Sequence, residues 1–103
     1  MQREMLVENA QLELDVAELK AKAAQKDKYN AETRLKLIEQ AGEKQKQIAA
    51  NQLQLAKNEL ALLELQASTG VNDAEMNDKL AQARAKVLTV QKDYNNALRE
   101  TNA

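Results

Sequence analysis

The chain contains no histidine and no cysteine, and these two absences exclude several kinds of functional site. The usual ligand sets for zinc and for iron–sulfur clusters depend on imidazole or thiolate groups. The Ser–His and Cys–His arrangements of nucleophilic catalysis require the same two residue types. We therefore expect no metal site, no cofactor and no nucleophilic catalytic centre.

Carboxylates are the remaining candidates for acid–base chemistry. Glu59 and Glu64 flank an apolar row, while Asp73, Glu75 and Asp78 gather where a helix is predicted to begin. An acid–base pair needs environments that push two pKa values apart, and a thin helical hairpin does not provide them. Acidic residues at a helix start are explained by the helix dipole, and the twelve-residue calcium-loop pattern is absent. We expect the chain not to be an enzyme.

An excess of basic residues and a set of aromatic residues are also missing. Lysine and arginine together number 15 against 16 acidic residues, and the only aromatic residues are Tyr29 and Tyr94. Binding to nucleic acid depends on positive charge for the phosphates and on aromatic side chains for the bases. We expect no autonomous nucleic-acid binding.

Long apolar runs are absent as well. The longest one is Leu60–Leu63, whereas a helix that crosses a bilayer needs about 20 apolar residues. The first four residues do not resemble the start of a secretory signal. The expected location is therefore the cytoplasm or a particle assembled there, without a signal peptide or a transmembrane segment.

The chain has no proline and only two glycines, and it is rich in residues that favour helices. Its 103 residues allow one domain. We predict an all-α fold, a single elongated unit with a helix over about 3–67, a turn at 68–72 and a shorter helix over about 73–101. The pair resembles a helical hairpin or a coiled coil.

The turn is predicted from its residue types. Gly70 suits the left-handed position just past a helix end. Asn72 or Asp73 can cap the next helix, and Glu75 has the capping-box spacing from Asn72. The other glycine, Gly42, leaves two interpretations open. It is either an interior glycine that costs about 1 kcal/mol relative to alanine, or a hinge or place of close approach.

Apolar residues in the second predicted helix alternate in steps of four and three, which is the spacing of a helix-packing row. This row is Met76, Leu80, Ala83, Val87, Val90, Tyr94 and Ala97. A matching row in the first helix is Ala49, Leu53, Ala56, Leu60, Leu63 and Ala67. The connection of five residues favours antiparallel packing of these two rows, with the second helix folded back over about residues 42–67.

The first predicted helix has more apolar positions than one neighbour can cover. The first row extends back through Leu35 and Ile38, and its phase slips across residues 26–30 before another row begins. That row is Leu12, Val16, Leu19 and Ala23. A parallel second row is Leu37, Ala41, Ile48, Leu55 and Leu62. So wide a stripe implies more than one neighbour.

Residues 5–38 are expected to have no partner within the chain, so we predict a homo-oligomer, with an isolated rod-like monomer as the alternative. The predicted helix-packing interface consists of Leu12, Val16, Leu19, Leu35, Ile38, Leu53, Leu60, Leu63, Met76, Leu80, Val87, Val90 and Tyr94.

Three segments rich in alanine, glutamine, leucine and glutamate have a common character: residues 11–25, 29–39 and 52–60. They resemble the C-terminal helical regions of tailed-bacteriophage portal proteins. The resemblance is compositional and covers about residues 10–67. It implies a long helical barrel inside a capsid. The chain lacks the clip and wing regions of that family, so it would be either a barrel fragment or a separate small virion protein of similar design.

Two classes of function follow from these expectations. The first is a structural component of a phage assembly, such as a barrel, internal or scaffold protein, which packs against itself and other virion proteins. The second is a small adaptor or inhibitor that presents one helix face to a groove of a host protein.

Overall fold

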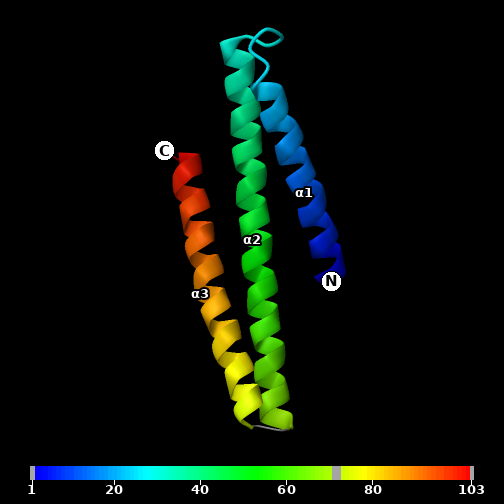
Figure 1. Cartoon of the computed structure of the whole chain (residues 1–103), viewed down its shortest axis with the longest axis vertical. Coiled ribbons are helices and arrows are strands. Elements are labelled where there is room, and N and C mark those ends of the chain that lie inside the picture. The colour runs from blue at the N-terminus through cyan, green and yellow to red at the C-terminus, as the bar shows by residue number, and fades with distance from the viewer. Residues whose placement is uncertain (1, 71–72, 103) are drawn as a thin grey trace.

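The structure is a computed structural model that describes residues 2–70 and 73–102, and three helices form most of this part (Figure 1). They are α1 (Gln2–Ala23), α2 (Ala31–Thr69) and α3 (Ala74–Asn102). The prediction of an all-α fold is confirmed. The molecule is elongated, with extents of 61 × 26 × 16 Å.

Helix α2 is the central element, and the two shorter helices run antiparallel to it on different sides (Figure 1). Helix α1 packs along the N-terminal part of α2, and α3 packs along the C-terminal part. Within the described residues, α1 and α3 do not contact each other. The fold is therefore two helical hairpins that share one helix.

The prediction of one helix over residues 3–67 is wrong, because the chain reverses direction between Ala23 and Ala31. Two polar side chains stabilise this reversal. Asn30 caps α2, since its Oδ1 accepts a hydrogen bond from the Thr33 backbone N–H at 2.8 Å. The Nε of Arg34 donates to the carbonyl oxygen of Ala23 at 2.6 Å, at the end of α1. A turn without glycine or proline is possible because side chains satisfy both helix ends.

The expectation that residues 5–38 have no partner within the chain is also wrong, since α1 packs on α2. Val16 and Ala23 of α1 are buried, and Ala41 of α2 is only 1% exposed. The predicted second row on α2 faces this helix, with Leu37, Ile48 and Leu55 half-buried and only Leu62 exposed. The inference that the wide stripe needs more than one neighbour is confirmed, and the additional neighbour is α1.

The antiparallel hairpin of α2 and α3 agrees with the prediction. Every residue of the two matching rows is buried or half-buried, including Tyr94. The buried members are Ala49, Leu53, Ala56, Leu80 and Ala83. Heptad spacing without a charged residue therefore identified the apolar contact of this hairpin.

Gly70 does not take the predicted left-handed conformation, because its φ is −143° and its ψ is −136°. The hydroxyls of Ser68 and Thr69 instead donate to the carbonyl oxygen of Leu65, at 2.8 and 2.9 Å. A Cβ atom on Gly70 would lie 3.3 Å from the carbonyl oxygen of Gln66, so the close approach favours glycine here.

Helix α3 is capped by Asp73, whose Oδ1 accepts from the Met76 backbone N–H at 2.9 Å. The other candidate cap, Asn72, lies outside the described residues.

Helix α2 runs through Gly42 without a break, so this glycine is an interior helix residue and not a hinge. None of the helices, as far as they are described, is long and apolar enough to cross a membrane.

Candidate functional site

The apolar core is small and consists largely of alanine. Among the residues that the structure describes, five of the eight buried hydrophobic ones are alanines, and the three larger ones are Val16, Leu53 and Leu80. In contrast, eight large hydrophobic side chains are more than half exposed: Leu6, Val7, Leu14, Leu35, Ile38, Leu62, Leu65 and Leu88. More large apolar side chains therefore face solvent than are buried in the chain, which marks these surfaces as candidates for interaction.

The predicted interface residues divide into two groups. Eleven of the thirteen lie in contacts within the chain, of which Val16, Leu53 and Leu80 are buried. The half-buried ones are Leu12, Leu19, Leu60, Leu63, Met76, Val87, Val90 and Tyr94. Only Leu35 and Ile38 remain more than half exposed. The predicted surface for a partner is thereby reduced to one end of α2.

Leu35 and Ile38 lie in a groove of about 1160 Å³ that all three helices line. Most of its apolar lining residues belong to α2 and also include Ala41, Ile48 and Ala49. Residues of α1 and α3, among them Val16 and Ala97, line its sides. The groove exists because α1 and α3 lie on different sides of α2 without touching each other.

The groove carries acidic residues from each helix. Glu13 comes from α1, Glu39 from α2 and Asp93 from α3. Of the two lysines that line it, Lys36 pairs with Glu32 at 3.8 Å. Four acidic and two basic residues line the groove beside its apolar residues, so its net charge is negative. Such a lining matches a helix that has an apolar stripe flanked by basic residues.

A second polar feature lies between α1 and α2, where two asparagines are buried. Asn9 and Asn51 are each 7% exposed, and the Nδ2 of Asn51 donates to the Oδ1 of Asn9 at 2.8 Å. Asn51 also contacts Glu8 at 3.3 Å, and Asn9 donates to the carbonyl oxygen of Ile48 at 3.3 Å. Among the described residues, no buried side-chain nitrogen or oxygen lacks a hydrogen-bond partner. The amide pair is therefore a satisfied network.

Sequence analysis missed this pair, although the signal was present. Asn9 stands four positions after Met5 and three before Leu12, so it occupies an apolar position of the α1 row. A polar residue at one such position is a known device for fixing the register of packed helices.

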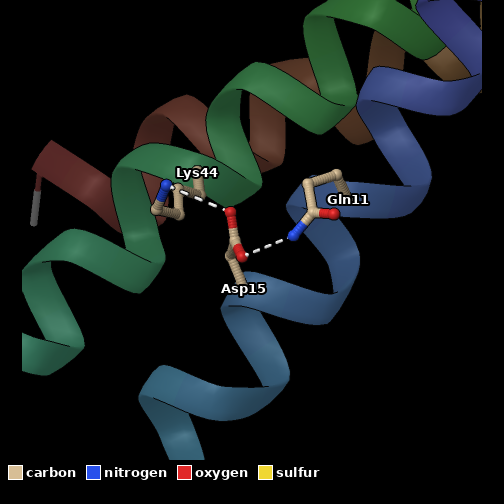
Figure 2. Close-up of polar contacts among 3 residues, drawn as sticks. All are labelled: Gln11, Asp15 and Lys44. Atoms are coloured by element: carbon tan, nitrogen blue, oxygen red, sulfur yellow. Dashed lines mark hydrogen bonds and ion pairs between the residues drawn. The ribbon is translucent and has the colours of Figure 1, made fainter.

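An ion pair joins the same two helices nearer the middle of α1 (Figure 2). The Nζ of Lys44 lies 3.5 Å from Oδ2 of Asp15, and the other oxygen of Asp15 accepts from Gln11 at 3.0 Å. Figure 2 shows Asp15 pointing from α1 toward α2, with Gln11 on the same side of α1. This pair connects charges on facing helices, so it adds to the register that the asparagines define.

The carboxylates considered for acid–base chemistry have other roles or are exposed. Glu59 pairs with Lys86 of α3 at 3.3 Å, Asp73 caps α3, and Glu75 pairs with Lys79 at 3.7 Å. Glu64 and Asp78 are exposed. Within residues 2–70 and 73–102, no three acidic side chains gather in a way that could hold a metal ion.

Comparisons with protein-family models, with curated proteins and with solved structures found no match to this chain. The surfaces described above are therefore the basis for inferring its function.

Proposed function

We propose that the chain is a non-enzymatic structural or assembly protein that acts through helix–helix packing and associates with copies of itself. The observation that carries this proposal is the exposure of eight large hydrophobic side chains around a core made mainly of alanine. Fully burying one such side chain contributes about 1.5–3 kcal/mol, so covering several half-exposed ones favours association.

The thickness of the molecule supports the same proposal. Its narrowest extent is 16 Å, which is little more than the diameter of one helix, about 10–12 Å. Stable domains bury an apolar face between at least two layers of secondary structure. A thin layer of three helices leaves apolar faces open, and packing against further copies would supply the missing layer.

We infer a bacteriophage particle as the setting, where the chain packs with its own copies and with other virion proteins, either in the virion or during assembly in the host cytoplasm. This part of the proposal is based on the compositional resemblance of about residues 10–67 to the helical barrel of portal proteins. Such chains would form a ring if one surface of each copy bound a different surface of the next copy. The rotation that relates neighbouring copies must then bring the last copy back to the first.

The groove supports a second candidate function, a small adaptor or inhibitor that binds a helix of a host protein. Its apolar residues and the excess of acidic over basic residues in its lining suit an amphipathic helix with basic flanks. This function predicts a complex of one chain with one partner, and it requires no self-association.

The two functions are separated by measuring absolute mass by light scattering over a concentration series. The wild-type chain is expected to exceed 11.5 kDa in a concentration-dependent manner or as a closed oligomer. The Leu35→Lys/Ile38→Lys variant is expected to have a lower mass than the wild-type chain, because two charges enter the groove. A mass that stays at 11.5 kDa for the wild-type chain would overturn self-assembly and favour the adaptor.

A matched control is the Gln66→Lys/Gln82→Lys variant, which adds the same charge at two exposed positions outside the groove. It is expected to keep the mass of the wild-type oligomer. Loss of association in this control as well would show that charge alone, and not the apolar residues of the groove, determines the result. Circular dichroism on all variants verifies that the helices remain folded.

A further inference from the structure

The connection between α1 and α2, residues 24–30, contains features of a helix although the chain reverses there. It has no glycine or proline. The backbone N–H of Ala24 donates to the carbonyl of Lys20 at 3.1 Å, and that of Tyr29 donates to Gln25 at 3.2 Å, which is the helical spacing. No described residue has a positive φ. Asn30 is extended, with φ −75° and ψ 170°, and the Lys26 backbone N–H donates to the carbonyl of Ala24 at 3.1 Å, which is not a helical spacing. A helical form of the connection therefore requires the backbone to change at these positions.

The facing rows of the two helices also share one heptad register across this connection. On α1, Asn9, Val16 and Ala23 recur every seven residues and are all buried. On α2, Leu37, Lys44 and Asn51 also recur every seven residues; Asn51 is buried, and the other two are half-buried. Lys44 and Asn51 contact α1. Ala23 and Leu37 lie fourteen positions apart, which is two heptads. If residues 24–30 were helical, both rows would lie on one face of a single helix over residues 2–69.

The contacts between α1 and α2 are arranged symmetrically about the connection. They join Asn9 to Asn51, Asp15 to Lys44, and Arg34 to Ala23. The midpoint of each pair falls within residues 28–30, so the connection is the centre of the antiparallel pairing. Two straightened chains placed antiparallel would form every one of these contacts twice, between the α1 of one chain and the α2 of the other.

We propose that two copies of this chain exchange α1 through a helical form of residues 24–30. The partner is a second copy of the chain, and the surface is the row of α2 that α1 covers in the single chain. Exchange of an identical element is a low-cost route to a dimer, because both forms make the same contacts. The exchange specifies one mode of the self-association proposed above and rests on it.

The balance between the two forms is determined by a few residues. The closed form has the Asn30 cap, which the exchanged form would lose. The exchanged form gains helical hydrogen bonds through the connection, but it places Asn30 in the heptad row at the centre of the dimer. A polar residue at this position opposes exchange. We therefore expect a weak dimer, which dissociates into single chains on dilution.

The test compares two substitutions at adjacent positions. Ala31→Pro stabilises the closed form, because proline is tolerated at the first residue of a helix and the residue before it favours the extended conformation that Asn30 has. Proline inside a continuous helix would break it. Asn30→Leu removes the cap and adds an apolar residue to the centre of the exchanged dimer. Its dimer dissociation constant is expected to fall at least tenfold, whereas the Ala31→Pro chain is expected not to exchange.

Exchange is detected by disulfide formation between different chains, since the wild-type chain has no cysteine. Equal amounts of an Asn9→Cys chain and an Asn51→Cys chain are mixed and oxidised. These positions face each other between α1 and α2, so a disulfide between residues 9 and 51 of two chains requires exchange. We expect this product, a higher yield with Asn30→Leu added, and its loss with Ala31→Pro added.

The outcomes distinguish exchange from self-association in general. Exchange alone is overturned if the wild-type chain has an oligomeric mass that Ala31→Pro leaves unchanged, and the mixture of the two single-cysteine chains gives no disulfide between residues 9 and 51. Both proposals are overturned if the wild-type chain and the Asn30→Leu variant are monomers at every concentration.

Discussion

The two hairpins of this molecule share α2 but use different chemistry to pack against it. The α2–α3 hairpin buries Leu53, Ala56, Leu80 and Ala83, and its ion pair between Lys86 and Glu59 is exposed at the edge. The α1–α2 hairpin buries the side-chain amides of Asn9 and Asn51 as well as apolar groups. It also contains the Asp15–Lys44 ion pair and the bond from Arg34 to the end of α1.

This difference separates two tasks of a helical interface. An apolar row contributes most of the free energy of packing but specifies its register weakly, since similar side chains recur along it. A buried amide pair contributes little net free energy, yet a shifted register would leave its polar atoms without partners. We infer that α3 provides most of the stability of the fold, and that α1 is held in one register by polar contacts.

The largest change in the free energy of unfolding is expected from a substitution in the apolar α2–α3 hairpin. Leu53→Ala removes a side chain that is 8% exposed, and we expect it to lower the free energy of unfolding by about 2–5 kcal/mol. Urea unfolding followed by circular dichroism measures this change. Leu88→Ala is the control, because Leu88 is 72% exposed and its loss is expected to change stability by less than about 0.5 kcal/mol. Equal effects of the two substitutions would contradict the assignment of stability to this row.

The next largest effect is expected from substitutions of the buried asparagines, which affect the stability and the register of the α1–α2 hairpin differently. Asn51→Ala leaves the buried Oδ1 of Asn9 without its donor, so we expect a loss of about 1–3 kcal/mol in the free energy of unfolding. Replacing both asparagines by leucine is expected to restore stability, because neither helix then buries an unpaired polar group. The double variant should nevertheless lose its single register, visible as multiple or broadened amide signals in NMR spectra of α1.

A control for the asparagine pair is Gln54→Ala, which removes an exposed amide that donates to Asn58 at 2.8 Å. It should change stability by a few tenths of a kcal/mol. A double leucine variant that keeps one sharp set of signals would show that the apolar positions of the hairpin are sufficient to define its register.

The contrast between the hairpins also explains which parts of the fold were predictable from sequence. The rows of α2 and α3 are apolar, spaced by heptads and connected through a segment with glycine, so their pairing followed from local pattern. The second row on α2 predicted another neighbour, and α1 is that neighbour. The spacing of apolar residues is sufficient to predict the pairing of helices where the residues in the contact are themselves apolar.

The reversal at residues 24–30 was not predictable in the same way. The segment lacks glycine and proline, and its residues include good helix formers, so propensity favours a continuous helix. What stabilises the turn is a cap by Asn30 and a bond from Arg34 to Ala23, eleven residues away in sequence. Asn9 and Asn51 were missed for a similar reason, because their partners across the hairpin, which include each other, lie on a different helix.

The smallest predicted effect concerns Gly42, which lies in the part of α2 that α1 covers and lines the groove. Gly42→Ala is expected to raise stability by about 0.5–1 kcal/mol, since alanine favours a helix interior more than glycine does. For a domain of this size, the midpoint of thermal unfolding should rise by about 4 °C. Gln45→Ala, an exposed position in the same groove, is the control and should change the midpoint less.

The helices in which Gly42→Ala raises stability show whether the two hairpins unfold separately. If the polar α1–α2 hairpin is the less stable of the two, Gly42→Ala should slow amide hydrogen exchange mainly in α1 and in the adjoining part of α2. Equal slowing in α3 would show that the two hairpins unfold as one cooperative unit. A fall in stability would contradict the helix-propensity explanation, and it would mean that a neighbouring group needs the space that glycine leaves in the groove.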